Sequence, residues 1–203
     1  MKSFFNQSFK SFGLFAVIGG LILLSSCGDD PEKENTPEAI NKTILTFTTD
    51  GGPSVIVTAE DEDGDGPQSI VFSGPIVLEA GTEYDLDITL FNGLLEVTDP
   101  EYNVTTEVKA EGDEHMFFFS WTNNLFSNPT GNGNIDARAD AVNYLDDDGT
   151  YPIGLETSWV TSASTGTGKF KLMLKHQPDL KTATSGSTVG ETDLELEFDL
   201  EIQ

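Results

Sequence analysis

A strict two-residue alternation of apolar and acidic side chains is the feature of this 203-residue sequence that most limits its fold. The alternation runs without a break through residues 192–202 and recurs through residues 82–92. Successive side chains of a β-strand point to opposite faces of a sheet, so this period predicts strands with one buried and one solvated face. In the last strand we expect the core-facing row to be Leu194, Leu196, Phe198, Leu200 and Ile202, and the solvated row to be Asp193, Glu195, Glu197, Asp199 and Glu201.

Shorter runs rich in β-branched and aromatic residues fill most of the remaining chain. Clusters of Gly, Pro, Asn and Asp separate these runs, and no segment after Cys27 shows a helical hydrophobic stripe. The pattern predicts an all-β fold, an antiparallel β-sandwich of the immunoglobulin-like, Greek-key kind over residues 42–203, with the connection 122–140 as a Greek-key crossing. The other predicted strands are residues 43–48, 54–60, 69–72, 76–78, 114–121, 141–145, 155–161 and 169–176, with a weaker strand at 104–109.

The N-terminal residues have the organisation of a bacterial export signal. Lys2 and Lys10 precede the apolar run 12–24, which is short for a membrane span of roughly 20 residues. The sequence Leu-Ser-Ser-Cys that ends at Cys27 resembles the lipobox of bacterial lipoproteins, in which the cysteine is acylated and becomes the new N-terminus. We therefore expect residues 1–26 to be a signal peptide, and the chain's single cysteine to carry fatty acyl chains such as palmitate. The alternatives are an ordinary signal peptide or a membrane anchor.

Residues 27–41 are acidic and punctuated by proline, which is typical of a flexible tether. Acidic residues directly after the cysteine also resemble the surface-export signal of lipoproteins from Bacteroidota. These features predict a protein attached to the bilayer of the outer membrane through its acylated cysteine. They leave open whether it faces the periplasm or the cell surface.

The charge of the chain restricts its partners and activities. The formal net charge is −25, and removing the two lysines of residues 1–26 gives −25 − 2 = −27 for the mature chain. Such a surface repels phosphate groups, so we expect no nucleic-acid partner. The sequence also lacks a Gly-x-Ser-x-Gly elbow and a glycine-rich phosphate loop, and we expect no enzymatic activity.

The chain has two histidines, and they stand in matching positions of two predicted strands. His115 begins one strand and His176 ends another, each in the core-facing row. If these strands run antiparallel, both imidazoles lie at the same end of the domain. Together with Asp113 and Glu114, they form a candidate zinc or copper site. The alternative is a pair of semi-buried histidines hydrogen-bonded to carboxylates or to the backbone.

Asp61, Asp63 and Asp65, followed by a glycine, match the first half of a calcium loop of the EF-hand kind. The glutamate required at the twelfth position is missing, because Phe72 stands there. These aspartates are weak candidate calcium ligands, and the acidic turn 146–149 is a weaker case of the same kind. Acidic turns between strands are more commonly solvated turns without an ion.

Four segments carry a family resemblance, at residues 111–119, 151–155, 172–179 and 190–193. They resemble a family of small lipoproteins from Bacteroidota that are often labelled as a type 1 periplasmic binding fold superfamily. That label implies a two-lobed α/β fold, whereas the residues of this chain predict strands throughout. The Asp-Glu-His and His-Gln-Pro sequences within these segments contain the two histidines of the candidate metal site.

These observations predict a non-enzymatic outer-membrane lipoprotein that acts as a binding module. Its ligand would be a metal ion or a metal-bearing compound, and its partner an outer-membrane transport receptor. The alternative is a structural or adhesive surface domain whose acidic loops are stabilised by calcium.

Overall fold

The computed structural model describes residues 38–64 and 69–203. The predicted signal peptide, Cys27, most of the predicted tether and Asp65 lie outside these residues. Within the described ranges, no helix combines the length and the apolar character that crossing a membrane requires.

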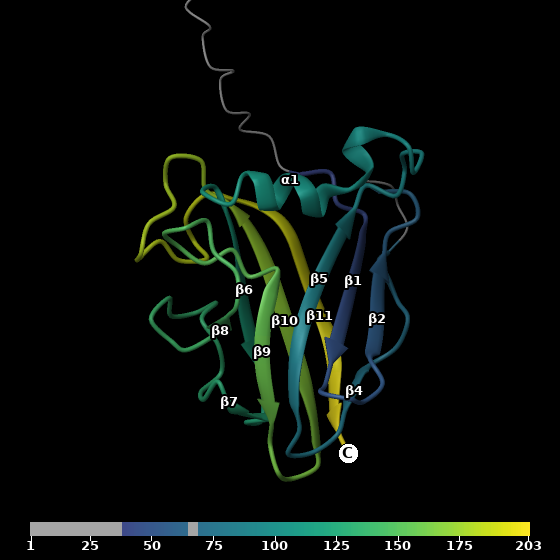
Figure 1. Cartoon of the computed structure of the whole chain (residues 1–203), viewed down its shortest axis with the longest axis vertical. Helices are drawn as coiled ribbons and strands as arrows, with labels where there is room; N and C mark the ends of the chain where they lie inside the picture. The colour runs from purple at the N-terminus through teal and green to yellow at the C-terminus, as the bar shows by residue number, and fades with distance from the viewer. Residues whose placement is uncertain (1–37, 65–68) are drawn as a thin grey trace, which may run out of the picture. The chain divides into compact units, whose positions relative to one another are not determined.

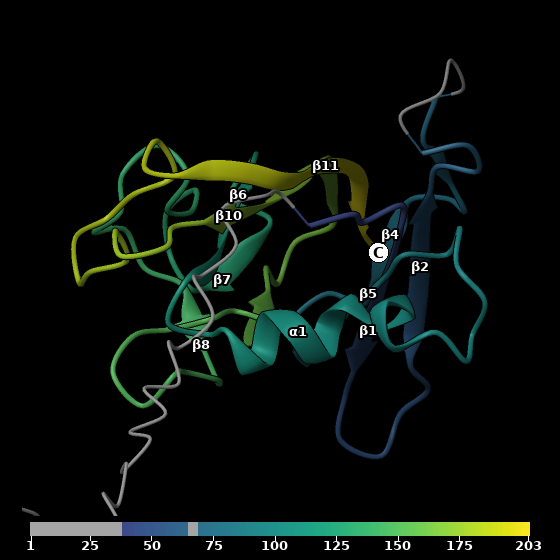
Figure 2. The same ribbon diagram turned by 90° about the horizontal axis from the view of Figure 1, so that it is seen from above.

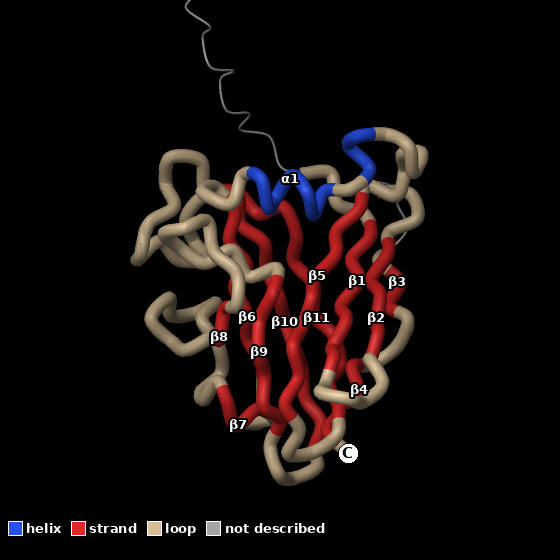
Figure 3. The backbone as a smooth tube through the Cα atoms, viewed as in Figure 1, coloured by secondary structure: helices blue, strands red, loops and turns tan. Residues whose placement is uncertain are grey.

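The described chain is mostly β, with its strands in two sheets (Figures 1 and 3). The larger sheet has the order β3-β2-β1-β5-β9-β7, with β8 also paired to β9, and the smaller has the order β4-β11-β10-β6. The strands of the larger sheet are β1 (Lys42–Thr48), β2 (Val55–Glu60), β3 (Val71–Phe72), β5 (Glu83–Phe91), β7 (Phe126–Asn128), β8 (Asn143–Tyr144) and β9 (Glu156–Thr161). Those of the smaller sheet are β4 (Ile76–Leu78), β6 (His115–Trp121), β10 (Gly166–His176) and β11 (Glu191–Ile202).

One hydrophobic core lies between the two sheets, which form separate layers when viewed from above (Figure 2). Phe47 of β1 and Phe170 of β10 have ring centroids 6.2 Å apart, and Phe119 of β6 and Trp159 of β9 have centroids 5.5 Å apart. All four rings are fully buried. Because each fully buried aromatic side chain contributes about 1.5–3 kcal/mol, this cross-sheet cluster is a major source of stability.

Strand pairing is antiparallel in both sheets except at β4. That strand pairs parallel with β11, opposing Ile76 to Leu200 and Leu78 to Ile202, so the smaller sheet is mixed rather than purely antiparallel. The parallel pair is possible because β4 and β11 are far apart in sequence and need no short hairpin between them.

The predicted weak strand at residues 104–109 is wrong, because this segment is helix α1 (Val104–Ala110). Val104 and Val108 are four residues apart, which places both on one helical face, and both are buried. The Thr105 hydroxyl accepts a hydrogen bond from the Leu90 N–H and donates one to the Leu90 carbonyl, which ties the helix to β5. A spacing of four residues also places both valines on one face of a short strand, so the sequence pattern alone was ambiguous. A short 3-10 helix, η1 (Pro100–Tyr102), precedes α1.

The alternation predicted for the last strand is confirmed with one exception, Asp193. Residues 194–202 alternate between buried and exposed side chains as expected. Opposite β10, however, Leu174 pairs with Leu194 whereas Lys175 pairs with Thr192, so Asp193 is an extra residue in a β-bulge. The bulge reverses the side-chain direction, and the Asp193 side chain is 0% exposed rather than solvated.

Candidate functional site

The register between β6 and β10 pairs His115 directly with His176. The two imidazole rings stack, with centroids 4.6 Å apart and an angle of 5° between the ring planes, and both side chains are buried. Both lie at the end of the sheets that α1 covers, where β6 begins and β10 ends (Figure 1). At Gly190 the backbone has a φ of 73°, and an added Cβ would collide with the His176 carbonyl oxygen. Glycine therefore allows the start of β11 to approach the histidine pair.

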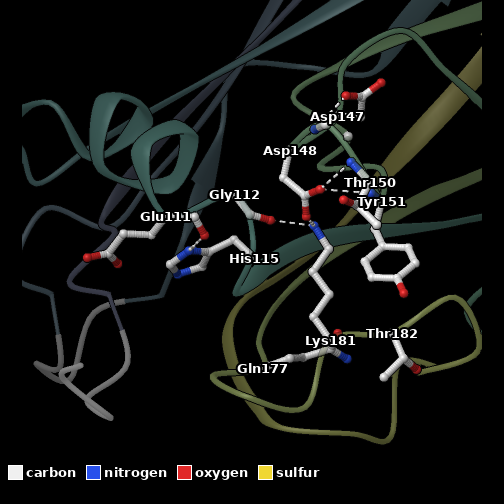
Figure 4. Close-up of polar contacts among 12 residues, drawn as sticks. Glu111, Gly112, His115, Asp147, Asp148, Thr150, Tyr151, Gln177, Lys181 and Thr182 are labelled. Carbon is white, nitrogen blue, oxygen red and sulfur yellow. Dashed lines mark hydrogen bonds and ion pairs between the residues drawn. The ribbon is translucent and has the colours of Figure 1, made fainter. Parts of the chain in front are cut away.

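Each histidine has one ring nitrogen held by an acceptor and the other without a partner. His115 Nδ1 lies 3.1 Å from the Glu111 carbonyl oxygen (Figure 4), and because a carbonyl only accepts, Nδ1 carries the proton. His176 Nε2 lies 3.2 Å from Glu114 Oε2, an acceptor when the carboxyl group is ionised. This leaves His115 Nε2 and His176 Nδ1 buried without a hydrogen-bond partner. Both are then free lone pairs that can accept a cation.

Carboxylates from three parts of the chain lie around these nitrogens. Asp193 Oδ2 is 3.6 Å from His115 Nε2, and Glu38 Oε1 is 3.7 Å from the same atom. Glu111, His115 and His176 each place one ligand atom within 4.8 Å of the other two. A second group with the same mutual distances consists of Glu38, Glu107 and Glu111. We call the six residues of this region the α1-end cluster: Glu38, Glu107, Glu111, His115, His176 and Asp193.

The electrostatics of the cluster keep His115 neutral. Burial lowers the pKa of His115 from 6.5 to about 4, and the electrostatic effects of His176 and Lys181 lower it further, against the Glu111 carbonyl and Glu114, which raise it. A neutral imidazole is the form that coordinates metal ions.

Three carboxyl groups of the cluster are shifted in the opposite sense, and at Glu111 burial is the largest cause of the raised pKa. Burial, followed by the charges of Glu107 and Asp193, raises the pKa of Glu38 to about 8. Burial likewise raises the pKa of Asp193 to about 6. Neighbouring carboxylates add to the raised pKa of Glu38, whereas His176 and Lys175 oppose the shift of Asp193.

The structure places the four sequence-predicted metal ligands differently. His115 and His176 are adjacent, and Glu114 contacts His176 through its carboxylate. Asp113 is exposed and lines a separate pocket of about 290 Å³ with Asp148 and Lys181.

The sequence interpretation missed Glu38, Glu111 and Asp193. Glu111 directly follows the segment that the sequence predicts as a strand rather than a helix. Its spacing of four residues from His115 therefore did not indicate that it lies near the histidines. Glu38 was assigned to the tether, and Asp193 to the solvated row of its strand. No sequence pattern indicated that Glu38 and Asp193 approach His115, because these contacts join segments more than 75 residues apart.

The first predicted calcium loop is described only in part. Asp61 Oδ1 accepts a hydrogen bond from the Asp63 N–H at 3.3 Å, a local turn contact. Asp61 also lines a pocket of about 530 Å³ together with Glu38 and Asp193. Among the residues that the structure describes, neither Asp61 nor Asp63 belongs to a group of three ligating side chains at metal-binding distances.

The second acidic turn uses its carboxylates to hold its own backbone. Asp146 accepts from the N–H groups of Gly154 and Leu155, at 2.8 and 3.1 Å, and Asp147 accepts from Gly149 at 2.7 Å. These short loop contacts explain the acidic residues without an ion.

Asp148 connects the same turn to a buried lysine. It accepts from the N–H groups of Thr150 and Tyr151 and forms an ion pair of 3.1 Å with Lys181 (Figure 4). Lys181 Nζ also donates to the Gly112 carbonyl, and its side chain is 1% exposed. Burial lowers the pKa of Lys181, against the effect of Asp148. The Lys181 side chain thus supplies the cation that pairs with Asp148 in this turn.

No protein-family model matches this chain, and a search of curated proteins finds no match either. The site is therefore interpreted from its own geometry.

Proposed function

We propose that this protein is a non-enzymatic, lipid-anchored binding module of the outer membrane. In this proposal it holds a metal ion, or a compound that carries one, at His115 and His176. Its attachment to the bilayer is the acylated Cys27, and its partner is an outer-membrane transport receptor that takes up the metal. The membrane face to which the domain is exposed, periplasmic or extracellular, is left open.

The observation that carries the proposal is the hydrogen bonding of the two imidazoles. Histidines that bind metals usually donate their second ring N–H to a carbonyl or a carboxylate, which orients the ring and fixes its tautomer. Both histidines have that arrangement, with Glu111 and Glu114 as acceptors. The remaining nitrogens are buried and unpartnered, and in native proteins such groups are uncommon unless they have a function.

The donor set supports zinc or copper(II) as the metal. Two imidazole nitrogens and the Glu111 carboxylate offer three ligands, and nitrogen donors suit these two ions better than calcium or magnesium. Sites with three protein ligands retain an open coordination position. A small chelating compound can occupy that position, which is why the proposal includes a metal-bearing ligand.

The two-sheet architecture also supports a more specific description of the fold. A core enclosed by facing sheets, with mostly antiparallel pairing, favours a β-sandwich of the Greek-key, immunoglobulin-like kind. In such a domain the strand ends and their loops carry the binding site, as the α1-end cluster does here. The rest of the acidic surface attracts cations towards the site and repels nucleic acid.

Titration of the metal-stripped full chain in detergent with zinc and copper(II), against a chromophoric chelator, tests the proposal. We expect one tightly bound ion per chain and at least a 100-fold loss of affinity in the His115→Ala, His176→Ala double variant. Glu111→Gln should weaken binding by about 10-fold or more, because it removes the candidate carboxylate ligand.

Asp113→Asn is the matched control, since Asp113 is exposed and lines a different pocket. It should bind zinc within about twofold of the unaltered protein, and thermal melting should show that each variant is folded. Unchanged zinc affinity in a folded double variant would exclude the histidine site. Calcium-dependent melting that persists in that variant would favour the calcium-stabilised structural domain instead.

A further inference from the structure

We propose that the pocket between residues 137–144 and residues 183–184 is a second binding site, which takes a small organic compound with one carboxylate group and an apolar body. Its anchor is Arg138, the only arginine of the chain. No residue that lines this pocket belongs to the α1-end cluster, so the inference goes beyond the proposed function and does not depend on it.

The pocket has the size and the lining of a small-molecule site. Its volume is about 590 Å³, and ligand pockets commonly measure roughly 300–1,000 Å³. Four alanines, Val142 and Tyr144 form most of its lining, and the short alanine side chains leave room for a ligand. The polar groups are Arg138, Asp140 and Thr184. A mostly apolar lining with a few polar groups gives both affinity and orientation to a bound compound.

The guanidinium group of Arg138 has no protein partner for its charge. Its Nε atom is buried without a hydrogen-bond partner, and no carboxylate of the described chain forms an ion pair with it. Five lysines of the same part of the chain do pair with carboxylates: Lys42, Lys109, Lys169, Lys171 and Lys181. In a chain with 35 acidic residues, the one arginine therefore stands apart from the other paired cations. Its planar fork of donors matches a carboxylate, which it binds through two parallel hydrogen bonds.

The wall that contains Arg138 is fixed by Tyr144 and Asn134. The Tyr144 hydroxyl donates to the Phe117 carbonyl at 2.7 Å and accepts from Asn134 Nδ2 at 2.8 Å. Asn134 is fully buried, and its Oδ1 accepts a hydrogen bond of 3.0 Å from the Phe119 N–H. Because the Tyr144 hydroxyl is already engaged within the protein, a ligand's carboxylate depends on Arg138.

The opposite wall is a turn that buried side chains hold in place. Ser185 Oγ accepts from the Thr182 N–H at 2.9 Å and donates to Gln177 Oε1 at 3.2 Å, and Gln177 is fully buried. Ser187 Oγ donates to the Ile135 carbonyl, which joins this loop to the segment that leads to Arg138. Both walls are therefore in position before a ligand binds, which lowers the entropy cost of binding.

The charges near Arg138 favour a ligand with a single negative charge. Asp140 lines the same pocket without pairing with Arg138, and the chain as a whole has a net charge of −25. One carboxylate is compensated by the guanidinium group, whereas a second anionic group would meet uncompensated repulsion. The apolar body of the ligand would contact the alanines and Val142, where its burial adds to the affinity.

Titration of the ¹⁵N-labelled full chain in detergent with phenylacetate, followed by NMR, tests this inference. Because the chain has one arginine, the Arg138 Nε–H gives a single arginine side-chain signal. We expect that signal and the backbone signals of residues 183–184 to shift and saturate together. Phenylacetamide, which has the same body without the charge, should bind at least tenfold more weakly. Phenylmalonate, with two carboxylates, should also bind more weakly than phenylacetate.

Two variants separate the charge from the pocket. Arg138→Gln should weaken phenylacetate binding at least tenfold, measured by the backbone signals of residues 183–184. Ala183→Phe should also abolish binding, because it fills the pocket from the opposite wall and keeps Arg138. Lys171→Gln is the matched control, since it removes one positive charge from a residue that does not line the pocket. It should bind phenylacetate within about twofold of the unaltered protein.

The histidine site and this pocket fail or succeed separately. The folded His115→Ala, His176→Ala variant should lose zinc and still bind phenylacetate, and Arg138→Gln should still bind zinc. No saturable shift up to about 10 mM phenylacetate would overturn the inference, since such a weak affinity is below that of a specific site. Equal binding by folded Arg138→Gln, or of phenylacetamide or phenylmalonate by the unaltered protein, would overturn it as well.

Discussion

The acidic turn at residues 146–151 and the α1-end cluster are both rich in carboxylates but differ in what neutralises them. In the turn, the three aspartates accept hydrogen bonds from five backbone N–H groups, and Lys181 supplies a buried positive charge. In the cluster, one backbone N–H, that of Glu38, donates to Asp193, and three buried atoms have no hydrogen-bond partner: His115 Nε2, His176 Nδ1 and Asp193 Oδ2.

This difference shows that the number of acidic residues is a poor guide to cation binding. Both regions contain several carboxylates. Those of the turn accept hydrogen bonds from the turn's own backbone, whereas the cluster has buried atoms without a hydrogen-bond partner. An unpartnered buried donor or acceptor costs roughly 1–3 kcal/mol, so a group of such atoms is a better guide to a candidate cation site than negative charge alone. Three experiments sharpen or break the comparison.

The largest decrease in the free energy of unfolding is expected from Lys181→Met. The substitution keeps most of the side-chain volume but leaves Asp148 and the Gly112 carbonyl without their buried partner. Breaking a buried ion pair from one side costs about 3–5 kcal/mol, and we expect a loss of that size in urea unfolding. Lys171→Met is the control, because its partner Glu195 is exposed and surface pairs contribute less than about 1 kcal/mol. Equal effects of the two substitutions would show that Lys181 does not neutralise the turn.

A smaller decrease in stability is expected when the pH of the metal-free protein is raised from 6.5 to 8. Glu38 has a pKa of about 8 in the folded protein against an ordinary value of 4.5, so in this window the folded state binds a proton that the unfolded chain has lost. The contribution of Glu38 to the stability of the folded protein is fully present below about pH 4.5 and is lost as the pH rises through about 8. The ionisable groups that face it are Glu107 from α1, the C-cap residue Glu111, Asp193 from β11 and His115 from β6.

Two other shifted groups of the cluster, His115 and Asp193, act at lower pH than Glu38. His115, with a pKa of about 4 against 6.5, makes the protein less stable as the pH falls from 6.5 to 4, because only the unfolded chain binds its proton there. Asp193, with a pKa of about 6 against 3.8, acts in the opposite direction over a similar range. We therefore expect the melting temperature to decrease between pH 6.5 and 8, and Glu38→Gln to remove most of that decrease. A slope that persists in the variant would contradict the assignment to Glu38.

The smallest effect is expected from Asp147→Asn. The amide oxygen can still accept the Gly149 N–H, and the side chain belongs to an exposed turn. We expect a change in unfolding free energy within about 0.5 kcal/mol and no change in zinc or calcium binding. A tenfold loss of calcium affinity would show that this turn binds an ion after all.

The sequence predicted more of the strands than of the site. The alternation placed Phe198, Leu200 and Ile202 in the core correctly, because a strand's two-residue period depends on local backbone geometry. It also placed His115 and His176 in core-facing rows of two strands. The strand prediction was wrong at residues 104–109, because the spacing of Val104 and Val108 fits both a strand and a helix. In the folded protein this segment is a helix that packs against β5.

The sequence by itself determined which side chains of the regular strands are buried, because that property repeats along the chain. Only the tertiary structure decided which groups surround the histidines. A bulge turns Asp193 inwards, a helix end presents Glu111, and the segment before β1 brings Glu38 to within 3.7 Å of His115. Each of these placements depends on how the sheets and α1 pack, and such long-range packing has no local sequence period to reveal it.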